Sequence, residues 1–550
     1  MKQTRPVTNG PLPIPADFDS KAMPFTFLPR GFAPGAPITA ALPDNQTHQW
    51  RMISRSTRTR TGGGLGKGID ACPLVFLSYG DSPTFGSVSG VDFLDRCASG
   101  RLEADGVSGF GSGEGEAGRA MENRLSQRAV WAEGQPIGDL MARALANPRL
   151  ISLAAGFVDP MTLPVEAASG GMADVLADPE LARAALQYGT THGHVVLRRM
   201  ILDRTRRADG VRARVDTTLD QVLIAAGSNQ LLHLIADTLL DPGDIVLTAA
   251  PTYLVFLGTL NNVGARPFSV SSDAQGIIPE ALSETLQSLQ SSGLLTRVKA
   301  VYLVPYYDNP SGALMSAERR DALVELARKW SIRHKIYVIA DNAYRDLRYG
   351  GEDVPSTYCF ADSDDRVIET GTFSKSFSPG IRVGWGILPR ELVGPICNQK
   401  GNIDFGSPNF VQYLIARILE GGQWEQHVER LRTAYSNKLR AMLAAADRHL
   451  APIEGTRWRA PSGGLYVWLE LPEGLDAGPE GALFDMAVDE GVLYVPGQYC
   501  YAAEGCPIRR DRIRLSFGVQ TEEGIARGIE ALGRAIREAM RSRSPRAINT

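Results

Sequence analysis

Short apolar runs alternate with helical stretches through the middle of the chain, and this alternation constrains the fold more than any other feature of the sequence. The apolar runs cover residues 222–226, 245–249, 298–304, 336–340, 366–370 and 383–388. Amphipathic stretches at 230–240 and 317–334 lie between several of them. Strands that are separated by helices form a largely parallel sheet with helices on both faces. The sequence therefore predicts a doubly wound α/β domain.

A second, smaller layer is predicted near the C-terminus. Residues 463–471 and 512–517 have the pattern of strands, and a helical stretch at 521–541 follows them. Strands and a helix that come after the alternating region are typical of a separate α+β unit. We therefore expect a small C-terminal domain beside the large one.

The first 120 residues differ in composition from the rest. Glycine and proline make up 29 of these 120 residues, against 62 of the remaining 430. This density breaks helices and strands, so we predict a mostly disordered extension over 1–120. Met121 opens the first helical pattern, which makes a start near Met121 an alternative. The predicted parts after the extension are an N-terminal arm or piece of the small domain at 121–165, a large domain at 166–420 and a small domain at 421–545.

Charge and cysteine usage exclude several classes of protein. The chain of 550 residues has 58 basic and 61 acidic side chains, a net charge of −3, which argues against nucleic-acid binding through bulk positive charge. Six cysteines show no CxxC pair, which favours free thiols in a reducing compartment over a metal site. We find neither a secretory pattern nor an apolar run of roughly 18 residues. We expect a cytoplasmic protein with no nucleic-acid partner, no membrane segment and no metal.

The segment at residues 369–385 (ETGTFSKSFSPGIRVGW) places a lysine between two predicted apolar strands. Phenylalanines flank Lys375, so we expect a partly desolvated amine in its neutral, nucleophilic form, although a solvated surface lysine is the common alternative. Thr372 and Ser374 offer hydroxyls, and Arg382 offers a guanidinium fork that suits a phosphate. A nucleophilic lysine beside a phosphate-binding set is what a Schiff base with pyridoxal phosphate (PLP) requires.

This segment resembles the S-K-x-x-x-P-G-x-R-x-G signature of the class I and II aminotransferases, which are fold type I enzymes that use PLP. The match runs without a gap through Ser374, Lys375, Pro379, Gly380, Arg382 and Gly384. The resemblance extends over about residues 128–541, and its pattern is most similar to the aminoadipate, kynurenine and broad-specificity group. It implies a large PLP-binding domain with a mainly parallel sheet flanked by helices, and a smaller α+β domain.

The resemblance also assigns the phosphate contacts. Ser228 and Asn229, in the sequence AAGSNQ, match phosphate-binding positions between a strand and a helix. Backbone amides and the positive end of a helix favour an anion there. Outside this context Ser228 would be interpreted as a simple helix N-cap. Thr372, Ser374 and Arg382 complete the implied phosphate set.

Four further residues are implied to contact the cofactor ring. Tyr253 matches the aromatic residue that stacks on the pyridine ring, Asn309 and Tyr344 match contacts to its phenolic oxygen, and Asp341 matches the carboxylate that keeps the pyridine nitrogen protonated. Taken alone, Tyr253 fits a buried tyrosine equally well and Asp341 a helix N-cap. Lys375, Asp341 and Tyr253 are the predicted catalytic residues.

The substrate contacts follow from the same resemblance. Arg514, in RIRLSF, matches the arginine that holds the substrate α-carboxylate, whereas strand alternation alone does not separate it from Arg512. Gly156, in AAGFVDPMTLP, matches a glycine whose backbone approaches the substrate, and Asn309 is also placed at the substrate. Tyr188 matches a residue contributed across a dimer interface, which implies a homodimer.

Four positions depart from the family pattern. Asp308 stands where the family has Gln, and Ser311 stands where it has Thr. Val158 and Leu163 replace a Pro and a Phe near Gly156. Serine keeps the hydroxyl of threonine, but Asp308 adds a charge beside the site and leaves its local pairing open.

The implied activity is transfer of an amino group from an L-amino acid to a 2-oxo acid, with 2-oxoglutarate as the expected acceptor. One alternative is another PLP reaction on the same scaffold, such as that of a lyase, decarboxylase or synthase. A second is an aminotransferase-like domain that senses an effector in a transcriptional regulator, although residues 1–120 show no recognition helix. A third is an inactive relative, which would be expected to lack Lys375, Asp341 or Arg382.

Overall fold

The computed structural model describes residues 125–543, except 133, 135–137, 139–141, 143–146, 148 and 361–364. The predicted extension over 1–120 and the alternative start at Met121 lie outside these residues. Of the helical pattern that opens at Met121, the described part holds α2, Gln127–Trp131. Gly134 follows α2 with a left-handed φ of 77°, a conformation that favours glycine and does not continue a helix.

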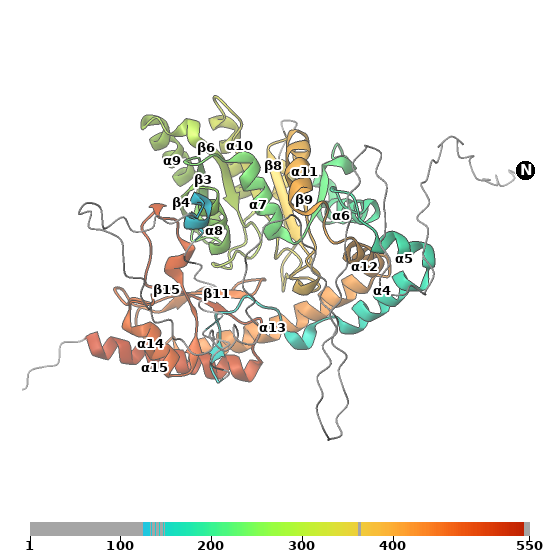
Figure 1. Ribbon diagram of the computed structural model, residues 1–550. Helices are drawn as coiled ribbons and strands as arrows, with labels where there is room; N and C mark the ends of the chain where they lie inside the picture. The colour runs from blue at the N-terminus through green and yellow to red at the C-terminus, as the bar shows by residue number, and fades with distance from the viewer. Residues whose placement is uncertain are drawn as a thin grey trace, which may run out of the picture. The chain divides into compact units, whose positions relative to one another are not determined.

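A nine-stranded mixed sheet forms the centre of the described chain, in the order β14-β4-β3-β6-β7-β8-β9-β2 with β5 paired to β4 (Figure 1). Its strands are β2 Val222–Ala225, β3 Ile245–Ala250, β4 Arg266–Asp273, β5 Gly276–Ile277, β6 Val298–Leu303, β7 Tyr337–Asp341, β8 Val367–Thr372, β9 Gly384–Ile387 and β14 Glu504–Gly505. The six strands from β14 to β8 are mutually parallel, whereas β9 runs antiparallel to both of its neighbours. The predicted largely parallel sheet is confirmed.

Helices cover both faces of this sheet, as expected of a doubly wound fold. One face packs against α6 Val195–Asp209, α9 Pro279–Ser291, α10 Ala317–Trp330 and α12 Asn409–Glu420. The other packs against α7 Ser228–Leu239, α8 Leu254–Asn262 and α11 Arg390–Asp404. Successive residues of β2 point to opposite faces of the sheet. Leu223 packs on the face covered by α7, α8 and α11, and Ile224 packs on the face covered by α6, α9, α10 and α12.

Helix α10 is shorter than the predicted stretch at 317–334. It ends at Trp330 because Ser331 turns the chain. The Ser331 hydroxyl donates to the carbonyl oxygen of Ala327 at 2.7 Å and accepts from the amide of Ile336 at 2.9 Å. Serine competes in this way with the helical backbone bonds.

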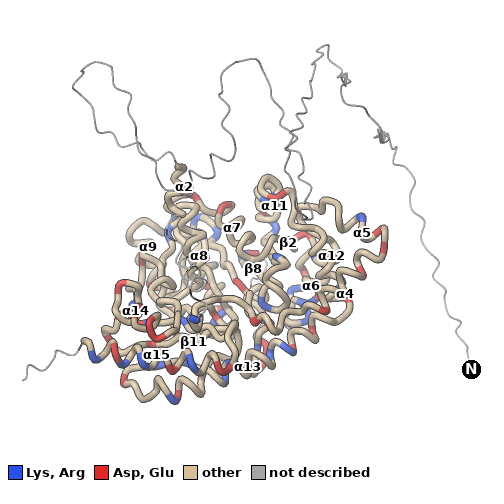
Figure 2. Tube along the Cα trace, turned by 60° about the horizontal axis from the view of Figure 1, so that its bottom comes forward, with Lys and Arg blue, Asp and Glu red and all other residues tan. Residues whose placement is uncertain are grey.

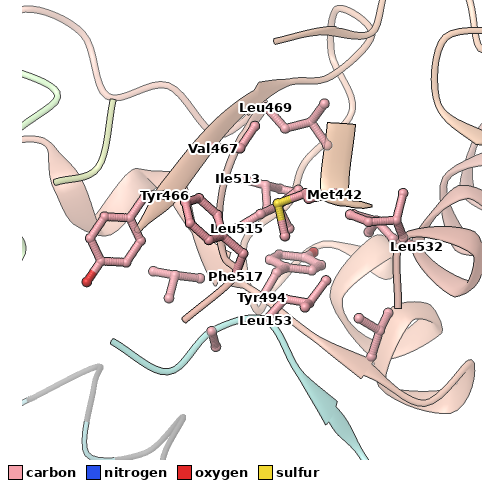
Figure 3. Close-up of a cluster of buried hydrophobic side chains, with 14 of the residues drawn as sticks. Leu153, Met442, Tyr466, Val467, Leu469, Tyr494, Ile513, Leu515, Phe517 and Leu532 are labelled. Atoms are coloured by element: carbon pink, nitrogen blue, oxygen red, sulfur yellow. The ribbon is translucent and has the colours of Figure 1, made fainter. Parts of the chain in front are cut away.

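The predicted second layer is an antiparallel sheet in the order β10-β11-β15-β13. Its strands are β10 Arg457–Trp458, β11 Tyr466–Glu470, β13 Val495–Pro496 and β15 Arg512–Ser516. It packs against α13 Gln423–His449, α14 Ala482–Asp489 and α15 Glu522–Arg543, and β1 Ile151–Ser152 pairs with β12 Val492–Leu493 beside it. Figure 3 shows part of this core, in which Tyr466 and Tyr494 lie among aliphatic side chains.

Charged residues of both signs are distributed along the described helices. Lys and Arg are interspersed with Asp and Glu along α13 and α15 (Figure 2). Within the described chain, no helix combines the length and the apolar character that a membrane span needs. The domain boundaries given above stay a prediction.

Candidate active site

The strand register brings the ends of β2, β7 and β8 to one edge of the large sheet. Asp341 pairs with Thr370, and both Ala225 and Thr372 pair with Gly384. The carboxyl ends of parallel strands in such a sheet are where ligands bind. The loops and helices that follow these strands therefore converge on one place.

A cavity of about 130 Å³ lies at this edge. Every residue predicted to contact the cofactor lines it, namely Ser228, Asn229, Tyr253, Asn309, Asp341, Tyr344, Thr372, Ser374, Lys375 and Arg382. These ten residues come from five separate strand ends, so their convergence is a property of the fold and not of one local segment. Val304, Ala343 and Pro379 complete the lining.

Lys375 lies in the turn after β8, between the large sheet and the segment that holds Gly156. Its Nζ donates to the carbonyl oxygen of Gly156 at 2.8 Å, which places Gly156 beside Lys375, while the predicted approach of its backbone to the substrate stays a prediction. Burial lowers the pKa of Lys375, and the positive charges of Arg514 and Arg382 act in the same direction, while Tyr466 opposes them. A lowered pKa increases the fraction of neutral, nucleophilic amine.

The start of α7 forms an anion-binding cup. Gly227 holds the N-cap with a left-handed φ of 85°, and no side chain caps the helix, so Ser228 is its first residue and not its N-cap. A Cβ on Gly227 would collide with the guanidinium of Arg382. The free backbone amides of the first turn of α7 therefore lie near the Arg382 guanidinium, and Gly227 leaves space between them. A phosphate group fits such a set of donors.

Hydrogen bonds fix the other side of the cup. Arg382 donates from Nη1 to the Ser374 hydroxyl at 3.4 Å and from Nη2 to the Ala226 carbonyl oxygen at 3.3 Å. The Thr372 hydroxyl donates to Ser374 Oγ at 2.9 Å. These bonds hold the guanidinium and two hydroxyls together before any ligand arrives, and donors set in this way suit a phosphate.

Asp341 ends β7 beneath the cavity and is buried. Its Oδ2 accepts from the Tyr302 hydroxyl at 3.1 Å, and its Oδ1 accepts from the Thr370 hydroxyl at 3.4 Å and the Ala343 amide at 3.3 Å. Burial raises the pKa of Asp341 to about 6, against the opposing effect of these donors. The carboxylate is thus oriented, ionised at neutral pH and suited to a cationic partner.

Two aromatic hydroxyls frame the opposite side of the cavity. The Tyr253 hydroxyl donates to Asn229 Oδ1 at 3.4 Å, which joins the predicted stacking residue to the phosphate cup. The hydroxyls of Tyr344 and Tyr466 lie 3.1 Å apart. Burial raises the pKa of Tyr253 and of Tyr344, so both phenols are protonated at neutral pH.

Arg514 lies beside the cavity on β15 and is buried. It donates from Nη1 to Asn309 Oδ1 at 2.9 Å and from Nη2 to the Ala154 carbonyl oxygen at 2.7 Å, while its buried Nε has no hydrogen-bond partner among the described atoms. Arg512, on the same strand, instead pairs with Glu470 and Asp511. An unsatisfied buried donor next to a ligand cavity fits a carboxylate.

Tyr188 is not brought to this cavity. It is 81% exposed and packs edge-on against Phe405, with ring centroids 5.7 Å apart. The predicted role of Tyr188 lies in a partner subunit, so a single chain does not test it.

The structure gives Asp308 a local hydrogen-bond partner, which the sequence alone did not identify. Its Oδ2 accepts from the amide and the hydroxyl of Ser311, at 3.2 and 2.5 Å. Burial raises the pKa of Asp308 to about 7, since these two bonds offset only part of the desolvation. The charge is therefore tied into the turn that carries Asn309.

Sequence reasoning missed three residues that contact the predicted set. Tyr302 opens the motif YLVPYYDNPSG, and Thr370 ends a predicted apolar strand, yet neither position signals a contact to Asp341. Tyr466 lies in a predicted strand about 120 residues after Tyr344. Among the described residues, no cluster of three or more His, Cys, Asp or Glu has the arrangement of a metal site.

Comparison with known proteins identifies relatives of this arrangement. The family model described as aminotransferase class I and II matches residues 149–532. Aromatic-amino-acid aminotransferase 1 of Thermococcus litoralis is 33% identical over 76% of this chain and 95% of its own length. 2-Aminoadipate transaminase of Thermus thermophilus is 34% identical over 74% of this chain and 97% of its own. The crystal structure of kynurenine aminotransferase from Pyrococcus horikoshii superposes with a TM-score of 0.69, at 33% identity over 76% and 97% of the two chains.

Proposed function

Because this chain belongs to the class I and II aminotransferases and is a PLP-dependent transferase of amino groups, we propose that the cavity at Lys375 is its active site. The observation that carries this proposal is the convergence of the ten predicted cofactor contacts, from five strand ends, on one cavity. When bound, PLP supplies an electron sink for the carbanion that forms at the substrate α-carbon.

The residues of the cavity divide into three roles. Ser228, Ser374 and Arg382 would hold the phosphate at the start of α7, and the ring of Tyr253 would cover the pyridine. Asp341 would pair with the pyridine nitrogen and stabilise its proton. The Lys375 amine would act as the base that takes the proton from the substrate α-carbon. The geometry that supports these roles is the contact of 2.8 Å between Lys375 Nζ and the Gly156 carbonyl oxygen and the hydrogen-bonded cup around Arg382. Burial, which lowers the pKa of Lys375, acts in the same sense.

The alternatives differ in their support. Another PLP reaction would use the same lysine and aspartate, and the named transaminase activities of the relatives favour amino transfer instead. The names of these relatives also support an aromatic amino acid or 2-aminoadipate as the donor. The expected acceptor is 2-oxoglutarate, which is usual in the family. The four described cysteines are free thiols, which supports a reducing, cytoplasmic location.

Arg514 is expected to bind the α-carboxylate of the amino donor. Arg514→Lys keeps the charge but loses the fork, so we expect kcat/KM to fall by about 10²-fold, the cost of about 3 kcal/mol for a damaged buried charge pair. The measurement is steady-state transamination with a panel of aromatic and acidic amino acids. Arg512→Lys is the matched control on the same strand and should leave kcat/KM unchanged. Equal effects of the two substitutions would contradict the assignment.

A homodimer is supported by the apolar residues that the described chain leaves exposed. They gather before, within and between α4 (Val165–Ala177), α5 (Pro179–Leu186), α6 and the end of α11. Twelve of the eighteen exposed large apolar side chains among the described residues lie there, namely Phe157, Met161, Leu163, Val165, Met172, Leu176, Leu186, Tyr188, Val195, Val196, Ile403 and Phe405. An exposed apolar set of this extent marks an interaction surface. We propose that a second copy of the chain covers it.

Mixing an impaired Tyr188 variant with an inactive Lys375 variant tests whether Tyr188 serves the partner's site. Tyr188→Ala alone should lower kcat/KM by about tenfold or more. In a mixed dimer with Lys375→Ala, one site carries both substitutions and the other carries neither if Tyr188 acts across the interface. Random pairing then restores about a quarter of the wild-type sites. If Tyr188 acts within its own chain, co-expression restores none, and a monomer in light scattering would contradict the dimer itself.

A further inference from the structure

Tyr466 connects the small-domain core to the edge of the active-site cavity. It begins β11 and is only 2% exposed, although it does not line the cavity. In Figure 3 its hydroxyl points away from the other labelled side chains of the core. A buried phenol that turns its hydroxyl out of an apolar core needs a polar partner.

That partner is Tyr344. The two hydroxyls lie 3.1 Å apart, and the rings meet edge-to-face at 5.8 Å. No other described residue hydrogen-bonds to either hydroxyl. If Tyr344 donated, the Tyr466 proton would be buried without an acceptor, which is costly. If Tyr466 donates, the Tyr344 proton is free to enter the cavity, because Tyr344 lines it.

The ring of Tyr466 serves a second group. The Arg514 guanidinium carbon lies 4.5 Å from the centroid of this ring, in the geometry of a cation–π contact. This contact adds to the two hydrogen bonds that Arg514 makes with Asn309 and Ala154.

The hydroxyl also lies against the segment that receives the reactive amine. A Cβ at Gly156 would approach the Tyr466 oxygen to 3.0 Å, so glycine leaves room for the hydroxyl there. The carbonyl oxygen of Gly156 accepts from Lys375. Tyr466 therefore contacts Tyr344, which lines the cofactor cavity, and Arg514, the predicted substrate contact, and it lies against the backbone of Gly156.

We propose that Tyr466 is a positioning residue for amino transfer, which acts on the cofactor side through its hydroxyl and Tyr344, and on the substrate side through its ring and Arg514. This inference rests on the proposed function. The hydroxyl fixes the Tyr344 phenol with its proton directed into the cavity, where it donates to the cofactor's phenolic oxygen. The ring holds the guanidinium plane without using any of its N–H donors, so Nε–H, which has no partner among the described atoms, stays available for a carboxylate.

Two substitutions of Tyr466 separate the two actions. Tyr466→Phe keeps the ring, so we expect KM for the amino donor within about twofold of wild type and kcat lowered by about five- to tenfold. Tyr466→Leu also removes the ring, so KM should rise by about tenfold as well. A general loss of folding would lower the amount of active enzyme in both variants and would not change kcat alone in one and both kcat and KM in the other.

A spectroscopic titration gives a readout independent of turnover. A donor to the phenolic oxygen stabilises the more negative, deprotonated form of the bound chromophore, so losing it raises the pH midpoint of the visible band. Tyr466→Phe should raise this midpoint by roughly half a pH unit or more, and Tyr344→Phe should raise it further. Because the two hydroxyls act in series, adding Tyr466→Phe to Tyr344→Phe should change the midpoint little.

Tyr494→Phe provides the matched control. This buried tyrosine lies in the same core, and its hydroxyl donates to the Ala477 carbonyl oxygen at 3.0 Å, away from the cavity. For Tyr494→Phe, the pH midpoint of the visible band and KM for the amino donor should equal those of wild type. The inference is overturned if Tyr466→Phe behaves like Tyr494→Phe, or if it shifts the midpoint equally with and without Tyr344. A wild-type protein that binds no PLP would overturn the proposed function first, and this inference with it.

Discussion

Lys375→Ala is expected to lower kcat for amino transfer by about 10⁴-fold or more, because one amine both holds the cofactor and moves the α-proton. Among the described residues that line the cavity, Lys375 is the one lysine. The amine lies 2.8 Å from the Gly156 carbonyl oxygen, and its pKa is lowered by burial. Arg382 carries a guanidinium, which suits an anion and does not take over either task.

Four measurements on Lys375→Ala separate chemistry from folding. The cofactor-free variant should melt no lower than the cofactor-free wild type, and it should still bind PLP through the phosphate cup. It should lose the covalent bond to the cofactor, which borohydride reduction and peptide mapping detect in the wild type. Added small primary amines should restore part of the proton transfer. Retention of more than about 1% of kcat would show that another group acts as the base.

Asp341→Asn is expected to lower kcat by about 10²- to 10³-fold, the effect of about 3–5 kcal/mol when one partner of a buried charge pair is removed. Asparagine keeps the shape, and its one amide oxygen can accept from Tyr302 or from Thr370 but not from both. It has no charge to hold a proton on the pyridine nitrogen. Asp308→Asn is the matched control, since Asp308 is a second buried carboxylate nearby that bonds only to Ser311 within the described chain. It should retain activity close to that of wild type.

The same substitution should make the cofactor-free protein more stable. The pKa of Asp341 is raised to about 6, above its unfolded value, so the native state binds a proton that the unfolded state releases between about pH 4 and pH 6. Native stability therefore falls as the pH rises through this window. At neutral pH and above, Asp341→Asn should raise the free energy of unfolding by about 3 kcal/mol, and the gain should vanish below about pH 4. Denaturant unfolding at both ends of the window measures it, and a loss of stability at neutral pH would contradict it.

The sequence predicted the residues that follow strand ends, because those positions carry local patterns. Lys375 and Arg382 lie in one continuous motif, and Asp341 ends an apolar run whose periodicity is plain. The parallel fold then places such ends at one edge without further information. This is why the ten predicted cofactor contacts meet in one cavity, although only the structure shows that they meet.

The contacts that were missed depend on register and on packing between the two sheets. Tyr302 reaches Asp341 from a neighbouring strand, and Tyr466 reaches Tyr344 from the small domain. No spacing along the chain encodes either pair. Arg514 and Arg512 share a strand, and strand alternation alone could not choose between them, whereas the structure buries Arg514 and pairs Arg512 with carboxylates.

The absorption spectrum of the purified protein with PLP tests the central claim most directly. We predict a visible band that bleaches when an aromatic amino acid or 2-aminoadipate is added without an oxo acid, and that returns when 2-oxoglutarate follows. Bleaching should be accompanied by the release of one 2-oxo acid per site. The return of the band should be accompanied by the release of one glutamate per site. A band that no amino acid bleaches, or one that bleaches and cannot be restored by any 2-oxo acid, would contradict amino transfer at Lys375.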